Sequence, residues 1–99
     1  EKGSVDLIFL CELLEHLDYT STDQTQVLAQ ALSIIKPNGY IFVSVPYEDR
    51  IPSPGHKTNF TRDMLRLLLE SSGATSVIDL DEMRYMYGLE NHFIFLMIK

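Results

Sequence analysis

The sequence predicts an α/β fold in which helices flank a mostly parallel sheet. Three observations predict it. Residues 5–11 (VDLIFLC) form a near-continuous apolar run, which is typical of a strand covered on both faces. Strand-like and helix-like patterns then alternate along the chain. The last strand-like run, residues 92–98, follows its predecessor too closely for a helical crossover. We therefore expect a three-layer sheet whose last two strands form an antiparallel pair.

A helical segment is expected after the first strand. Residues 12–17 (ELLEHL) are good helix formers and predict one or two helical turns. Ser21 and Gln24 have the spacing of a capping box, and the helix that they begin is predicted to run to about residue 35. Its buried stripe recurs at helical spacing and consists of Val27, Leu28, Ala31, Leu32 and Ile35.

A turn and a second strand come next. Residues 36–39 (KPNG) predict a turn, because proline presets its own φ and Asn-Gly tolerates positive φ. Residues 40–45 (YIFVSV) then form an apolar, β-branched run that Pro46 ends. Residues 47–59 are rich in proline, glycine and polar side chains and predict a long loop. In open α/β sheets, ligands bind at this carboxyl edge of the strands.

The final third of the chain predicts one helix and two strands. Thr61 can cap a helix that Gly73 is placed to end at the C′ position. Residues 75–80 and 92–98 are the two predicted strands, and the connection between them is rich in methionine and tyrosine. The apolar side of the helix consists of Met64, Leu65, Leu68 and Leu69.

Composition limits the classes of function. The 99 residues are 45% hydrophobic and 22% charged, which is typical of one globular unit, and no apolar run approaches the roughly 20 residues of a membrane span. A formal net charge of −6 argues against non-specific binding of nucleic acid. One cysteine excludes an internal disulfide and a cysteine zinc cluster.

No secretion signal is visible, so we expect a cytoplasmic protein. Because a strand follows an opening without Met, we expect a piece of a longer chain.

Three segments, in order, carry a family likeness: VDLIFLCELLEHL, LSIIKPNGYIFVSVP and HKTNFTRDMLRLLLESSGA. They resemble the fourth strand, the fifth strand and the following helix of class I S-adenosylmethionine-dependent methyltransferases, and the likeness spans about residues 5–74. It implies that residues 1–99 form the C-terminal half of a Rossmann-like sheet, in which the seventh strand lies between the fifth and sixth. The family's glycine-rich loop has no counterpart, since neither Gly3 nor Gly39 lies in a GxGxG setting. The half that holds most of the cofactor is therefore absent, and the isolated chain is expected to be inactive.

The resemblance also implies where ligands lie. Cys11 and Glu12, at the end of the first strand, would border the methionine part of S-adenosylmethionine. His56 and Tyr47, in the long loop, would lie on the substrate side, although a solvated histidine and a tyrosine packed on the core are the alternatives. Methyl transfer is an in-line displacement for which orientation can supply most of the rate effect. No catalytic residue is identified.

A divalent-metal site is a further hypothesis. Glu12, Glu15 and His16 fall at i, i+3 and i+4 and can share one side of a helix. With His56 they would supply carboxylate and imidazole ligands. The ExxEH pattern and its downstream His-Lys and Phe-Thr-Arg are similar to small-RNA 3′-terminal 2′-O-methyltransferases, and ExxEH also resembles quinone-biosynthesis O-methyltransferases. The alternative is that Glu15 and His16 bond nearby backbone and position the loop.

Two functions follow from these observations. The first is a methyltransferase that acts on an unidentified small-molecule or nucleic-acid hydroxyl or amine, an RNA terminus among them. The second is a non-catalytic interaction or dimerisation domain that forms a homodimer through its exposed first strand, because an unpaired apolar strand edge promotes association.

Overall fold

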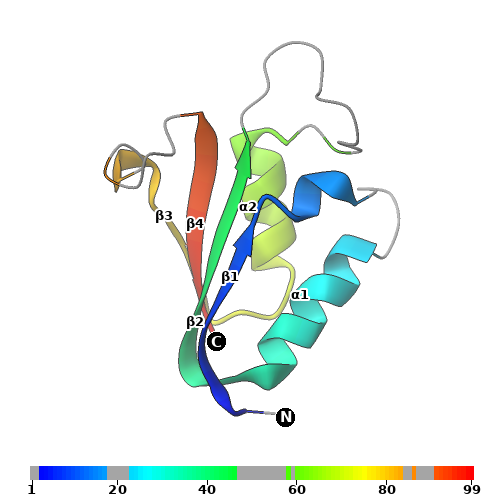
Figure 1. The fold of residues 1–99 in the computed structure, drawn as a ribbon, viewed down its shortest axis with the longest axis vertical. Coiled ribbons are helices and arrows are strands. Elements are labelled where there is room, and N and C mark those ends of the chain that lie inside the picture. Colours follow the sequence, from blue (N-terminus) through cyan, green and yellow to red (C-terminus); the bar gives the residue numbers. More distant parts are fainter. Residues whose placement is uncertain (1–2, 18–22, 47–57, 59, 84–85, 87–90) are drawn as a thin grey trace.

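The computed structural model describes residues 3–17, 23–46, 58, 60–83, 86 and 91–99 (Figure 1). Its elements confirm the predicted α/β class. In chain order they are β1 (Val5–Cys11), the 3-10 helix η1 (Leu14–His16), α1 (Asp23–Ile34), β2 (Ile35–Pro46), α2 (Arg62–Glu70), β3 (Ser76–Asp79), the 3-10 helix η2 (Asp81–Met83) and β4 (His92–Ile98). None of the helices described is long and apolar enough to cross a membrane.

The strands form one mixed sheet in the order β1-β2-β4-β3. β1 runs parallel to β2, whereas β4 is antiparallel to both β2 and β3. The predicted antiparallel terminal pair is therefore confirmed, and the last strand lies between its two predecessors as the family resemblance implied. Because of these directions, β1, β2 and β3 end at the same edge of the sheet at which β4 begins.

Both described helices pack on one face of the sheet. Figure 1 shows α1 and α2 on the same side of the strands, and the buried cluster joins apolar residues of both helices to alternate residues of the strands. The largest fully buried side chains of this core include Phe95, Leu14, Leu28, Ile35, Ile41, Leu65, Leu69 and Met97. The described residues thus form two of the three layers that the sequence predicts.

The opposite face of the sheet is partly open and apolar. Leu7, Phe9 and Tyr40 are exposed, and the exposed fraction of Phe9 is 63%. The ring of Phe9 meets that of Phe42 on the neighbouring strand, with 5.7 Å between centroids. Among the described residues β1 is an edge strand with one covered face, so the cover on both faces that its apolar run predicts is not present there, whereas the exposed first strand that was also expected is.

The predicted turn at residues 36–39 lies within β2 in the structure, at the point where the pairing of β2 with β1 is irregular. α1 ends at Ile34 and β2 begins at Ile35, so Ile35 is buried as a strand residue rather than as the end of the helical stripe. Asn38 has a φ of 66°, as its tolerance of the left-handed region predicts. Gly39 has no positive φ; a Cβ there would lie 2.7 Å from Ile35 Cγ1 and 2.9 Å from a backbone oxygen. Glycine is needed at that position because the backbone approaches closely.

The N-terminal cap of α2 is confirmed. The side chain of Thr61 accepts a hydrogen bond of 3.1 Å from the amide of Met64. The helix ends at Glu70 with Ser71 as its C-cap, so Gly73 lies two residues beyond the cap rather than at C′. Its φ of 102° nevertheless makes it the residue at which the chain turns away from the helix.

Candidate functional site

The candidate site lies where β1 and β2 end. Cys11 closes β1 with an exposed thiol, and Glu12 follows it. The amide of Glu12 donates a 2.9 Å hydrogen bond to the Ser44 carbonyl of β2, and its φ is 57°. Because few residues other than glycine adopt a left-handed backbone, this bend is imposed by the surrounding structure. It turns the chain abruptly out of the strand, and one turn of 3-10 helix, η1, replaces the predicted helical segment.

Glu12 pairs with a histidine from the other end of the chain. Its Oε1 lies 2.6 Å from Nε2 of His92, the first residue of β4. β1, which ends just before Glu12, and β4 are not neighbours in the sheet, because β2 lies between them. The contact therefore spans the end of β2. The Glu12 side chain is 59% exposed and that of His92 only 16% exposed. His92 is therefore held within the protein, whereas the Glu12 carboxylate is open to ligands.

His92 was not among the site residues predicted from the sequence. The signal that could have indicated it is its position: an antiparallel last strand begins at the edge where the parallel strands end. His92 stands at the start of the run predicted as that strand. Topology, rather than any local motif, could have placed it beside Glu12.

Two polar atoms near this pair are buried without a hydrogen-bond partner among the described residues. They are Oγ of Ser44 and Nδ1 of His92. Ser44 lies opposite Cys11 in the parallel pair of strands, and therefore near the end of β1. Most buried polar atoms in proteins are satisfied, and unsatisfied ones often belong to functional sites. Ser44 Oγ can donate or accept a hydrogen bond at this edge.

Glu15 and His16 lie in η1 and have different surroundings. Glu15 is buried, with 2% of its side chain exposed, whereas the His16 side chain is 47% exposed. The Glu15 carbonyl accepts a 3.0 Å hydrogen bond from the amide of Thr58, and His16 Nε2 lies 3.9 Å from Glu15 Oε2. These contacts favour the alternative in which the two residues position the loop.

The metal hypothesis is not supported by the part of the chain that the structure describes. Within it, no three His, Cys, Asp or Glu side chains are grouped so as to hold a metal ion, and Glu12 faces His92 instead. His56 and Tyr47 lie outside the described residues. The four-residue metal site and the substrate-side roles of His56 and Tyr47 therefore stay predictions, as do the cofactor contacts of Cys11 and Glu12.

A buried glutamine braces η1 against the chain that precedes α2. Nε2 of Gln24 lies 2.9 Å from the Leu14 carbonyl, 3.1 Å from the Leu17 carbonyl and 3.2 Å from Oγ1 of Thr58. Thr58 Oγ1 donates in turn to the Leu17 carbonyl at 2.7 Å. By its spacing, Gln24 was predicted to form a capping box with Ser21, which lies outside the described residues. In the structure its amide instead fixes the loop that carries Glu15.

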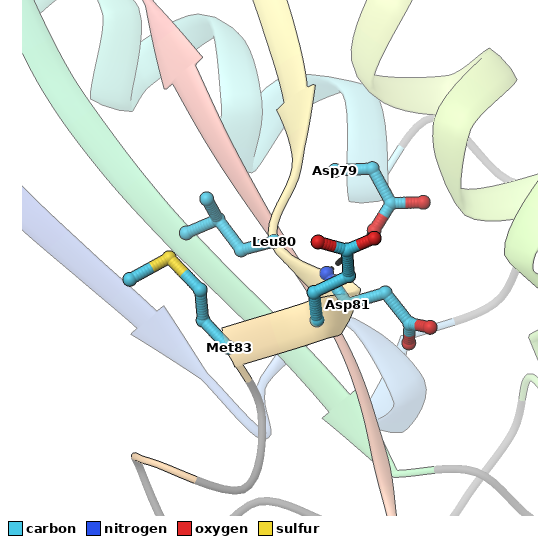
Figure 2. A pocket seen from close by; sticks show the side chains of 5 residues that line it. Asp79, Leu80, Asp81 and Met83 are labelled. Carbon is cyan, nitrogen blue, oxygen red and sulfur yellow. Dashed lines mark hydrogen bonds between the residues drawn. The ribbon is translucent and has the colours of Figure 1, made fainter.

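A shallow hollow opens further along the same edge, beyond β4. It has a volume of about 430 Å³ and is lined by Asp79, Leu80, Asp81, Glu82 and Met83 (Figure 2). Arg66 lies 3.2 Å from Asp79, and Arg62 lies 2.8 Å from Asp81. Two of its three acidic side chains are thus paired with α2, which indicates a structural role for them.

Solved structures show which fold this is. No family model and no curated protein matches the sequence. A SAM-dependent methyltransferase from Archaeoglobus fulgidus superposes with a TM-score of 0.73 at 16% identity, over 99% of this chain and 61% of that one. The chain has part of the methyltransferase fold.

Two further methyltransferases agree. One from Leishmania major gives a TM-score of 0.63 at 20% identity, over 99% of this chain and 39% of its own length. One from Aquifex aeolicus gives a TM-score of 0.54 at 18% identity, over 98% of this chain and 46% of its own length. The chain therefore spans less than two thirds of each of these SAM-dependent methyltransferases, and the likeness at such identities establishes the fold.

Proposed function

We propose that the chain is the C-terminal half of a cytoplasmic S-adenosylmethionine-dependent methyltransferase, and that it forms the side of the domain next to the methyl acceptor. One observation supports this most strongly: 99% of the chain superposes on part of a SAM-dependent methyltransferase with a TM-score of 0.73. The order β1-β2-β4-β3, with an antiparallel strand inserted before the last, is the arrangement that the family resemblance predicted.

The carboxyl edge of the sheet suits such a cofactor. S-adenosylmethionine, when bound, supplies a methyl group on a positively charged sulfonium. Glu12 offers an exposed carboxylate to the cationic methionine end, and the buried hydroxyl of Ser44 offers a hydrogen-bond partner beside it. Cys11 would border the same end. The residues present therefore fit the predicted cofactor, whose adenosine would be held by the other half of the domain.

The methyl acceptor is proposed to be a small molecule or an RNA terminus that carries a hydroxyl or amine. The chain's part in the reaction is to orient this acceptor in line with the methyl group, because orientation alone can supply much of the rate effect. The described His, Cys, Asp and Glu side chains do not group in threes as a metal site requires, and the predicted metal ligand His56 lies outside the described residues.

Binding of S-adenosylhomocysteine tests the proposal. Calorimetry of the isolated 99 residues is expected to detect little or no affinity. The whole methyltransferase domain of which this chain is proposed to be a part is expected to bind. Tight, stoichiometric binding by the isolated chain would contradict the division of the site between two halves, and no binding by the longer protein would contradict the methyltransferase assignment.

A second candidate, an interaction or dimerisation domain, is favoured by the apolar edge strand. β1 has one unpaired edge among the described strands, and its Leu7 and Phe9 are exposed. Such an edge promotes pairing with another chain. Light scattering would support this candidate if the isolated chain forms a dimer of defined mass, and a monomer at high concentration would argue against it.

A further inference from the structure

We infer that Glu12 and His92 act together on the methyl acceptor: Glu12 accepts the hydroxyl proton of the nucleophile, and His92 is the positioning residue that holds Glu12 in place. This inference rests on the proposed function and narrows the acceptor to a hydroxyl. It is drawn from the 2.6 Å contact between Glu12 Oε1 and His92 Nε2 at the carboxyl edge of the sheet.

His92 fixes one oxygen of the carboxylate and leaves the other available. A carboxylate can only accept hydrogen bonds, so Nε2–H of His92 is the donor to Oε1. At 2.6 Å this is a short, charge-assisted contact. Oε2 makes no hydrogen bond to the described residues, and the Glu12 side chain is 59% exposed. The contact therefore orients Glu12 without using up its capacity to accept a proton.

The backbone fixes the same group from the other side. The amide of Glu12 is bonded to the Ser44 carbonyl, and its φ of 57° is one that side-chain-bearing residues seldom adopt. Backbone strain of this kind clusters at functional sites. Glu12 is thus held by its main chain on β2 and by its side chain on β4.

The chemistry of a carboxylate selects the acceptor. When a hydroxyl oxygen attacks the methyl carbon, the carbon–sulfur bond breaks, the sulfur leaves as a neutral thioether, and the hydroxyl proton moves to Oε2 of Glu12. The sulfonium cation and the carboxylate anion are neutralised in the same step. An amine has a free lone pair and can lose its proton to water afterwards, and a thiolate carries no proton, so neither needs this group.

A purely structural ion pair would behave differently. Such a pair with one exposed member contributes little to stability and is insensitive to the nature of the acceptor. The Glu12–His92 pair would then tie β4 to the end of β1 and do nothing more. An assay that compares two acceptors distinguishes these roles, because a structural defect lowers the rates with both.

The test uses the whole methyltransferase domain proposed above, with catechol as the hydroxyl probe and 4-nitrothiophenol as a thiolate probe. S-adenosylhomocysteine release gives kcat and KM for each. We expect Glu12→Gln to lower the catechol-to-thiolate ratio of kcat by about 10²-fold, the usual contribution of a positioned base. Glu82→Gln removes an exposed carboxylate elsewhere on this edge, and is the matched control expected to keep the ratio within twofold.

His92 is tested by rescue. His92→Phe is expected to lower kcat with catechol at least tenfold, while His92→Gln, which keeps an N–H donor for Glu12, recovers most of that loss. In the 99-residue chain, ¹⁵N spectra of the imidazole should show hydrogen on Nε2, and Glu12→Gln should shift that resonance. A spectrum with hydrogen on Nδ1 and none on Nε2 would show that His92 does not donate to Glu12, and would overturn the inference.

The outcomes separate this inference from the proposed function. Wild-type protein that does not bind S-adenosylhomocysteine contradicts the methyltransferase assignment itself. Protein that binds it, but methylates only the thiolate or methylates neither probe, overturns the hydroxyl assignment. Equal losses with both probes in Glu12→Gln, or no rescue by His92→Gln, leave the pair with a structural role only and also overturn the inference.

Discussion

Replacing Gln24 with leucine should destabilise the loop that carries the candidate site. The Gln24 amide has two hydrogens and three oxygen acceptors within 3.2 Å, so at most two strong hydrogen bonds are lost. At a net contribution of about 1 kcal/mol each, their loss would lower the free energy of unfolding by about 2 kcal/mol.

Two features of the structure reduce that figure. The Leu14 carbonyl still accepts the Leu17 amide, and the Leu17 carbonyl still accepts Thr58 Oγ1, so neither oxygen is left without a partner. Oε1 of Gln24 is itself buried without a hydrogen-bond partner among the described residues, and leucine removes the cost of burying that oxygen. We therefore expect a loss of about 1 to 2 kcal/mol, or about 4 to 16 °C in Tm for a domain of this size.

Urea unfolding followed by far-UV circular dichroism measures the effect at low protein concentration. Gln30→Leu makes the same change on an exposed turn of α1 and should stay within about 0.5 kcal/mol of the wild type. Gln24→Glu would place a buried carboxylate against the Leu14 and Leu17 carbonyls and should cost more, about 3 kcal/mol. If Gln24→Leu unfolds at the same urea concentration as Gln30→Leu, the brace does not stabilise the loop.

Three further changes test the fold. Gly39→Ala should lower the free energy of unfolding by about 1 to 3 kcal/mol in the same assay, because the new Cβ would lie 2.9 and 3.0 Å from two backbone oxygens. Phe9→Glu should reduce self-association in light scattering, since it places a charge on the open apolar face; an unchanged mass distribution would locate association elsewhere. Arg66→Ala should cost about 1 kcal/mol in urea unfolding, because Arg66 pairs with Asp79 and stacks on Phe95; no change would show that this pair is fully screened.

The sequence predicted best those elements whose signals are local. The last strand was predicted at residues 92–98, the bounds that it has, because an unbroken apolar run there follows polar residues. The start of α2 was marked by the hydroxyl of Thr61. At the end of α1 the local signal was ambiguous, because the apolar Ile35 suits both a helical stripe and a buried strand.

The contacts of the site could not be predicted from local sequence patterns. Glu12 and His92 are 80 residues apart, and no spacing rule links them. Gln24 matched a capping box by spacing, yet its amide reaches the carbonyls of η1 because these backbone groups are buried and need donors. Glu12 was expected on a helix beside Glu15, but its left-handed backbone takes it out of helical geometry, so the i, i+3 relation that motivated the metal site does not apply.

The site and the open face belong to the same side of the sheet. Side chains alternate along a strand, and the register places Phe9 opposite Phe42, and Cys11 opposite Ser44, on the side away from the helices. His92 lies on this side too, because it stands opposite Pro46, two residues beyond Ser44. The exposed Phe9 and the edge at which Glu12 meets His92 therefore lie on one side of the sheet, and a layer packed on this side would cover the apolar face and border the candidate site.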